Sequence, residues 1–239
     1  MSKFIIKEDF FEVFPEAEIG VVTAKNINND PDALDADSLR EISDMLQASF
    51  ETAKTHLPEE TFIENKVVGV WREAFRKFKT KKGARCSIEA MLKRVQKDNP
   101  PGNINPLVDI YNSVSLTYAL PCGGENIDSF KGDLILTIAE GGEDFLALGD
   151  TEPDPALPGE VIYRDDEGAV CRCWNWRDGQ RTMLTEDTKN AFLILESVDP
   201  ERHDDLMKAL DDLASKAKKY LGGDTQVIFM NKDSSECDL

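Results

Sequence analysis

Hydrophobic and polar positions recur with two different periods along this chain of 239 residues. In the first half, apolar side chains return every three or four residues, which is the spacing of one helical face. The pattern predicts helices at 38–57, 65–79, 87–97 and 106–120. Ser38 and Glu41 form a capping box at the start of the first helix, and Ser87 is the expected N-cap of the third.

The second half has short apolar segments separated by polar turns, which is the pattern of strands. Strands are predicted at 132–139, 144–148, 159–165, 169–176 and 191–197, with two more at 18–24 and 225–231. A helix at 201–221 stops at Gly222 and Gly223. Helices first and strands later indicate an α+β fold, with helices grouped around a mostly antiparallel sheet. We expect a single domain over residues 1–231, followed by a polar tail at 232–239.

Composition narrows the class of protein. A hydrophobic fraction of 41% and a charged fraction of 31% are typical of a globular protein in water. The sequence contains no apolar run near the roughly 20 residues that span a membrane, and its acidic N-terminus does not resemble a signal peptide. We therefore expect a cytoplasmic protein. Phosphate-binding glycine loops and the GxSxG and HExxH motifs are missing from the sequence, so no cofactor is expected.

The positions of the cysteines and histidines do not predict a metal site. The five cysteines include no CxxC pair, and the two histidines, His56 and His203, lie far from them in sequence. A thiol nucleophile at Cys122 or Cys173 is not expected either, because neither has an evident histidine partner.

The charge is strongly negative but uneven. The net charge is −18, which argues against DNA as a partner because phosphate contacts need lysine and arginine. Residues 66–97, however, hold eleven basic residues against two acidic ones. This segment could orient an RNA end on an acidic body, or it could be a solvated helix face.

The segment from Asn105 to Asp128, NPLVDIYNSVSLTYALPCGGENID, has the most informative sequence. It predicts a helix that begins at Pro106, stops at Pro121 and enters a turn formed by residues 122–124. Asp109 and Asn112 are three residues apart, so they share a helical face that we expect near this turn. The segment resembles the corresponding helix and turn of the B3/B4 editing domain of the phenylalanyl-tRNA synthetase beta chain.

The resemblance continues downstream in the same order. Residues 141–143 (GGE) and 185–190 (TEDTKN), and a strand that ends at Glu196, are similar to motifs of that domain, so the match spans 85–197. Residues 172–177 (RCWNWR) resemble a signature of free-standing relatives. Two departures stand out. Gly123 occupies the place where the synthetase usually has a histidine, and the segment before Glu196 is two residues longer, which keeps the strand parity but leaves the register of Glu196 uncertain.

The resemblance implies a free-standing trans-editing deacylase that removes a mischarged amino acid from the 3′ end of a tRNA, with aminoacyl-tRNA as its partner. Aminoacylation itself is not expected. The amino acid removed and the oligomeric state stay open. The backbone of Gly123 and Gly124 would place water or an oxyanion, assisted by Asn112. The implied substrate contacts are Asp109, Cys122, Trp174, Asn175 and Glu196, and the implied tRNA contacts are Arg76, Lys79, Lys82 and Arg85.

Each of these roles has an alternative. The two glycines could simply close a turn, and Asp109 and Asn112 could bond backbone there. Glu196, as a buried carboxylate, needs either the substrate or an arginine as a partner. Trp174 and Trp176 would share one face of a strand, and at least one of them could be core. The alternative function is a non-catalytic RNA or small-molecule binding module that retains the fold.

Overall fold

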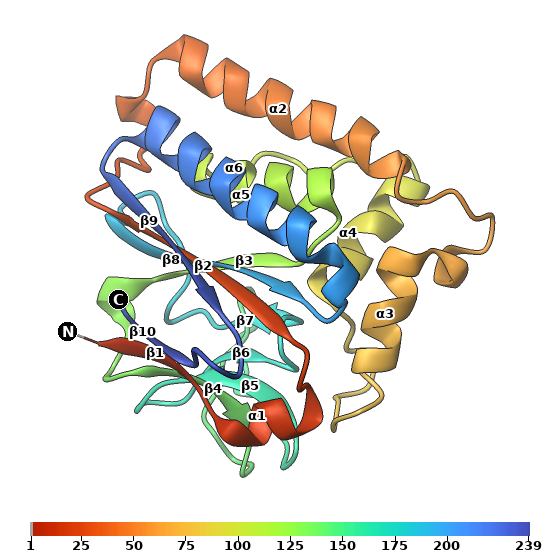
Figure 1. Cartoon of the computed structure of the whole chain (residues 1–239). Helices are drawn as coiled ribbons and strands as arrows, with labels where there is room; N and C mark the ends of the chain where they lie inside the picture. Colours follow the sequence, from red (N-terminus) through yellow and green to blue (C-terminus); the bar gives the residue numbers. More distant parts are fainter. Residues whose placement is uncertain (1) are drawn as a thin grey trace.

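The computed structural model describes residues 2–239 and contains two β-sheets and a group of helices (Figure 1). In chain order the elements are β1 Lys3–Ile6, α1 Glu8–Val13, β2 Glu18–Lys25, α2 Ala36–Lys54, α3 Lys66–Ala74, α4 Ser87–Gln96, α5 Pro106–Tyr118, β3 Cys122–Asn126, β4 Leu134–Ile138, β5 Val161–Arg164, β6 Ala169–Arg172, β7 Arg177–Asp178, β8 Asn190–Ser197, α6 His203–Leu221, β9 Asp224–Met230 and β10 Glu236–Asp238.

The strands form a six-stranded sheet of order β10-β1-β4-β5-β6-β7 and a four-stranded sheet of order β3-β8-β2-β9. Neighbouring strands are antiparallel, apart from β1 and β4, which run parallel. The predicted α+β class with mostly antiparallel pairing is therefore confirmed. The strands are divided between two sheets rather than joined in one.

The four-stranded sheet is the centre of the molecule because both of its faces are covered. Helices α2, α5 and α6 lie over one face, and the six-stranded sheet lies across the other (Figure 1). Alternate residues of β8 serve the two sides: Leu193 and Leu195 pack with the helices, whereas Phe192 packs against Phe4 of β1 with ring centroids 5.1 Å apart. We call the side that faces the six-stranded sheet the inner face.

Helix α5 follows the predicted pattern at its start and differs at its end. Asn105 is the N-cap, accepting a hydrogen bond from the Val108 N–H at 3.0 Å, and Pro106 is the first helical residue. The helix ends at Tyr118 because Ala119 adopts a left-handed conformation with φ of 47°. Pro121 therefore lies outside the helix rather than ending it.

Several predicted boundaries were wrong. Helix α2 is capped by Asp35, whose carboxylate accepts the Ser38 N–H at 2.8 Å, so Ser38 lies inside the first turn. Ser87 likewise is the first residue of α4 rather than its cap. The predicted helix at 65–79 ends at Ala74.

Two predicted segments have a different structure altogether. Residues 144–148 form no strand; Ala147 makes an isolated bridge with Gly179, and single backbone hydrogen bonds link the segment to Ala169 and Gln180. The expected polar tail at 232–239 includes β10, which extends the six-stranded sheet by pairing with β1. Its polar composition suits a strand at a sheet edge, where one side faces water.

Candidate functional site

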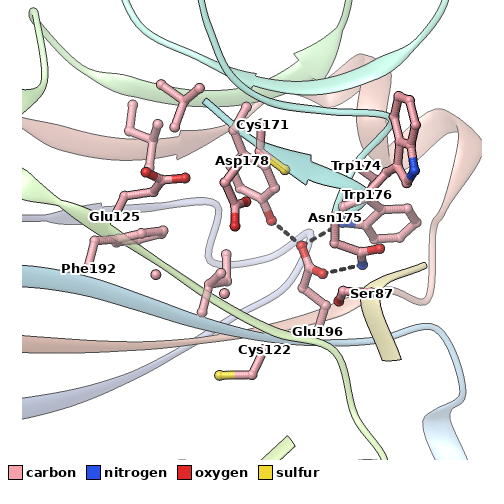
Figure 2. Close-up of a pocket in the computed structure, with 16 residues that line it drawn as sticks. Ser87, Cys122, Glu125, Cys171, Trp174, Asn175, Trp176, Asp178, Phe192 and Glu196 are labelled. Atoms are coloured by element: carbon pink, nitrogen blue, oxygen red, sulfur yellow. Dashed lines mark hydrogen bonds between the residues drawn. The ribbon is translucent and has the colours of Figure 1, made fainter. Parts of the chain in front are cut away.

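A cavity of about 70 Å³ lies between the inner face of the four-stranded sheet and strands β5–β7. Figure 2 shows carboxyl, aromatic and thiol side chains around it. The lining residues are Ser87, Cys122, Gly123, Gly124, Glu125, Leu134, Tyr163, Val170, Cys171, Trp174, Asn175, Trp176, Asp178, Phe192, Ile194 and Glu196. Six of the predicted site residues line this one cavity. They come from β3, from the turn before β7 and from β8: Cys122, Gly123, Gly124, Trp174, Asn175 and Glu196.

Glu196 is the central group of the cavity. It lies near the end of β8, is 1% exposed, and accepts hydrogen bonds from Trp174 Nε1 at 2.7 Å, from Asn175 Nδ2 at 2.5 Å and from the Tyr163 hydroxyl (Figure 2). Burial raises the pKa of Glu196 to about 7, although the three hydrogen bonds oppose the shift. The partner that a buried carboxylate needs is therefore neither a substrate nor an arginine but three neutral donors of the same chain.

Two of the three donors, Trp174 and Asn175, are positioned by a tight turn at residues 173–176. Cys173 and Trp174 have φ of 47° and 64°, and the Trp174 N–H donates to Val161 C=O at 2.6 Å. This backbone overturns the predicted strand at 169–176, because β6 ends at Arg172. The prediction that Trp174 and Trp176 share one face of a strand is therefore wrong: Trp174 is fully buried in the turn, and Trp176 is half-buried at the cavity.

Arg172 anchors the start of this turn. Its guanidinium is fully buried and forms two hydrogen bonds with Glu160, at 2.9 and 2.7 Å, and an ion pair with Asp154 at 2.8 Å. Glu160 is also fully buried. Bidentate pairing satisfies both charges away from water, and it holds the backbone from which Trp174 and Asn175 extend.

The Gly123–Gly124 segment is a strand and not a turn. Both residues belong to β3, with Gly123 opposite Ile194 and Gly124 opposite Leu193 of β8. Residues that face each other across an antiparallel pair share a face, so Gly123 opens onto the inner face. A Cβ added there would meet only Ile194 Cγ2, at 3.8 Å, whereas one added at Gly124 would lie 2.8 Å from methyl groups of Leu184 and Leu193.

The outer side of β3 is not paired with another strand of its sheet, because β3 lies at the sheet edge, and residues 182–183 cover part of that side through a bridge from Glu125 to Met183. The Glu196 N–H donates to Pro121 C=O at 3.3 Å, and the Asn126 N–H donates outward to Thr182 C=O at 2.8 Å. Bonded and non-bonded pairs alternate in an antiparallel ladder, so the N–H of Gly124 points away from β8, toward the edge. The N–H of Gly123 has the opposite orientation and points toward β8.

Two further carboxyl groups line the cavity. Glu125 of β3 is 5% exposed, and Asp178 of β7 is half-buried. Burial raises the pKa of Glu125 well above its usual range, and the neighbouring charge of Asp178 adds to the shift. Burial raises the pKa of Asp178 as well. Within the described residues, lysine, arginine and histidine are missing from the cavity lining.

Asp109 and Asn112 are not at the cavity. Both lie on α5, beyond the opposite face of the four-stranded sheet. Asp109 accepts hydrogen bonds from Asn103 Nδ2 at 2.8 Å and from the Ile104 N–H at 2.9 Å, so it holds the loop before the helix. The thiol of Cys122 points away from Glu196 (Figure 2) and packs on the helix side of β3.

The predicted tRNA contacts lie in the connection from α3 to α4. Lys79, Lys82 and Arg85 are exposed, whereas Arg76 pairs with Glu73 one helical turn away. The same connection leads directly into Ser87, which lines the cavity and donates its N–H to Asn175 C=O at 3.2 Å. Arg85 is therefore two residues from the cavity wall.

Sequence reasoning missed Tyr163, Glu125, Asp178 and Cys171. Strand parity could have found Glu125, because it is two residues from Gly123 and shares its face. No sequence signal connected β5, β6 and β7 to the inner face. For the thiols, burial raises the pKa of Cys173 to about 12 and that of Cys122 well above its usual range, so neither is a thiolate at neutral pH.

No cluster of three or more potential metal ligands occurs between residues 2 and 239. Over the same range, none of the helices is both long enough and apolar enough to cross a membrane.

Two sheets with helices over one of them, and a cavity with a buried carboxyl between the sheets, define an α+β domain. The B3/4 domain family model matches residues 70–221, more than half of the chain and beyond both ends of the predicted core. The chain belongs to the B3/4 domain family, and it is related to a tRNA synthetase subunit.

One sequence relative is the phenylalanine–tRNA ligase beta subunit of Ruegeria pomeroyi, which is 37% identical over 90 residues. This match covers 38% of the chain and 11% of the relative. A similar solved structure is an N-terminal fragment of the phenylalanyl-tRNA synthetase beta-subunit from Pyrococcus horikoshii, at 14% identity and a TM-score of 0.48, covering 96% of this chain and 54% of that one. The chain thus spans only part of each.

Proposed function

We propose that this domain binds the aminoacylated 3′ end of a tRNA, with the aminoacyl group at the cavity, and hydrolyses the ester of a mischarged amino acid. The observation that carries the proposal is Glu196, a buried carboxyl whose pKa of about 7 lies within the neutral range. A group that gains and loses a proton near the working pH suits general acid–base catalysis. Ester hydrolysis needs such a group to accept a proton from the attacking water.

The geometry of Glu196 leaves room for that water. A carboxylate offers about four lone-pair positions, and Oε2 is bonded only to Asn175 Nδ2. Oε1 accepts hydrogen bonds from both Trp174 Nε1 and the Tyr163 hydroxyl, which hold the carboxyl in place. Gly123 contributes space, because it presents no side chain on the inner face. We predicted that Gly123 would donate its N–H from a turn. In this proposal it instead leaves the cavity wall open at its position.

The oxyanion that forms during hydrolysis needs preorganised donors. The N–H of Gly124 points away from β8, toward the outer edge of β3, so it is our candidate donor. Asn112 and Asp109 have no part in this proposal because they lie behind the sheet. The exposed cations Lys79, Lys82 and Arg85 would hold the phosphates of the tRNA end, since their connection leads into Ser87 at the cavity.

The decisive experiment incubates the purified protein with a panel of mischarged tRNAs and measures release of the amino acid. We expect release from at least one member, and Glu196→Gln should abolish the pH dependence near pH 7 together with most of the rate. Glu152→Gln is the matched control, because Glu152 is exposed and outside the cavity. Release at the buffer rate from every member would refute hydrolysis.

Binding of tRNA is tested separately from hydrolysis. Replacing Lys79, Lys82 and Arg85 together should weaken binding and reduce the slope of log affinity against log salt by about 2, since each contact with a single strand contributes about 0.7. The control replaces Lys208, Lys218 and Lys232, which are exposed on α6 and near β10. Equal slopes for the two triple variants would show that the α3–α4 connection is only a solvated surface.

A binding module without hydrolysis is the second candidate. It is favoured by the hydrogen bonds to Glu196, which already engage three donors, and by the lack of histidine among the described cavity residues. The two functions differ in one result. The module would bind aminoacylated tRNA with the salt dependence above and release nothing.

A further inference from the structure

The unsatisfied polar atoms of the cavity are mainly hydrogen-bond acceptors. Glu125 Oε2 is buried and, within residues 2–239, has no hydrogen-bond partner. The Glu125 side chain reaches into the cavity from β3 (Figure 2). Asn175 Oδ1 is a second buried acceptor without a partner. Leaving a buried acceptor unpaired costs about 1–3 kcal/mol, so both atoms favour a ligand that donates hydrogen bonds.

The charges around the cavity point in the same direction. Glu125, Asp178 and Glu196 contribute three carboxyl groups, and no cationic side chain in the described part of the chain lines the space with them. Arg181 is the cation that acts on Glu125, but both of its terminal nitrogens bond Asp165, at 2.8 and 2.7 Å. The donors of Tyr163, Trp174 and Asn175 are used by Glu196 and do not reach Glu125.

We propose that the cavity binds an organic ammonium group, held by the carboxylates of Glu125 and Asp178. An ammonium supplies three donors and a positive charge, whereas the group that the chain itself offers to Glu125 as a donor is the neutral Thr182 hydroxyl, and the described cavity lining holds no cation. Phe192 lies beside Glu125 and offers an aromatic surface for a cation. A metal ion fits less well because the described residues form no cluster of three ligands.

The size of the cavity limits the ligand. A volume of about 70 Å³ admits a small head group rather than a large amine. Two sources have this chemistry: the α-amino group of an aminoacyl ester, and the amine of a basic side chain. The inference shares the cavity with the proposed function but goes beyond it, because ammonium binding requires neither tRNA nor hydrolysis.

Binding should strengthen with pH. Asp178 of β7 raises the pKa of Glu125, whereas the Thr182 hydroxyl and Arg181, both beyond β7, lower it; Cys171 of β6 and Tyr111 of α5 also lie near it. With its pKa raised, Glu125 holds a proton at low pH, and an ammonium has to displace that proton to pair with the carboxylate. Affinity therefore rises from pH 5 to pH 8, while an alkylammonium with a pKa near 10 stays charged.

Isothermal titration calorimetry on the whole chain, at constant ionic strength, tests the proposal with ethylammonium, alaninamide, N-acetylalaninamide and ethanol. The two amines should bind, with proton release, and the two neutral compounds should not. Tighter binding of alaninamide identifies an α-amino site, and tighter binding of ethylammonium identifies a side-chain amine site. Equal affinity for amines and neutral compounds would overturn the proposal.

Glu125→Gln and Asp178→Asn remove charge without changing volume, so each should weaken ethylammonium binding by at least about tenfold, or 1.4 kcal/mol. Glu152→Gln should bind as the wild type does. If either cavity variant fails to fold, the wild-type pH profile decides, because a constant affinity between pH 5 and pH 8 would refute the role of these carboxyls. Unchanged affinity in both folded variants would refute it too.

The two proposals can fail separately. Ammonium binding without release from any tRNA would leave this inference standing and refute hydrolysis. An N-acetylated aminoacyl-tRNA could be hydrolysed as fast as the form with a free amine, with no binding of either amine. That result would support hydrolysis and refute ammonium binding.

Discussion

Replacing Glu196 by glutamine should change how the stability of the fold depends on pH. Glutamine has nearly the same shape, and its carbonyl can accept the bonds from Tyr163 and Trp174. Its amide would face Asn175 Nδ2, but Asn175 can turn over because its Oδ1 has no partner. The variant therefore keeps the packing of the cavity and removes the ionisation of one buried carboxyl.

The magnitude follows from the pKa of Glu196. That pKa is raised from 4.5 to about 7 in the folded chain, so the folded state binds more protons than the unfolded state between these values. The stability contributed by the protonated carboxyl is fully present below pH 4.5 and is lost as the pH rises through 7. Between pH 5 and pH 9 the loss is about 2.5 kcal/mol, from 1.36 kcal/mol per pKa unit.

Urea unfolding at pH 5, 7 and 9 measures this difference. Other titrating groups are shared by both proteins and largely cancel in the comparison. We expect the free energy of unfolding of the wild type to fall, relative to that of Glu196→Gln, by about 2.5 kcal/mol from pH 5 to pH 9. Parallel pH profiles would show that Glu196 ionises near its ordinary pKa, and the reasoning about a desolvated carboxyl would be refuted.

Three further predictions concern residues that shape or stabilise the fold around the cavity. Gly123→Ala should keep the thermal midpoint within a few degrees, whereas Gly124→Ala should lose about 1–3 kcal/mol from its closer contacts; equal melting curves would contradict the strand register. Arg172→Met should cost about 3–5 kcal/mol in urea unfolding, because it leaves Glu160 buried and unpaired; a loss below about 1 kcal/mol would mean that Glu160 is solvated. Asp109→Ala should lower the free energy of unfolding by about 1–2 kcal/mol through the loop it holds, with tRNA deacylation unchanged; a loss of activity at full stability would place it in the site.

The local patterns predicted well what depends on near neighbours in the chain. The start of α5 followed from Asn105 and Pro106, because capping is decided within one turn. Burial of Glu196 followed from its place in an apolar strand. Paired glycines, however, suit both a turn and a strand beside a cavity. Only the pairing of β3 with β8 distinguishes these states, and that pairing is set by residues about 70 positions apart.

The contents of the cavity depended on contacts across the two sheets. Tyr163 reaches Glu196 from the other sheet, and this distant contact has no signature in either strand. The turn at 173–176 looked like a strand because its aromatic residues favour strands. Its left-handed backbone at Cys173 and Trp174 is held instead by the buried Arg172–Glu160 pair. Local propensity could not predict this, because the ion pair joins two separate strand ends.

The cavity around Glu196 is the proposed working site of the domain. Release of amino acid from the mischarged tRNA panel should be compared among the wild type, Glu196→Gln and Gly123→Phe, with folding of each checked by thermal melting. Gly123→Phe places a ring on the open inner face and fills the cavity, while Glu196 itself is not replaced. We predict release by the wild type and loss of release in both variants. Undiminished release by a folded Gly123→Phe variant would contradict the account.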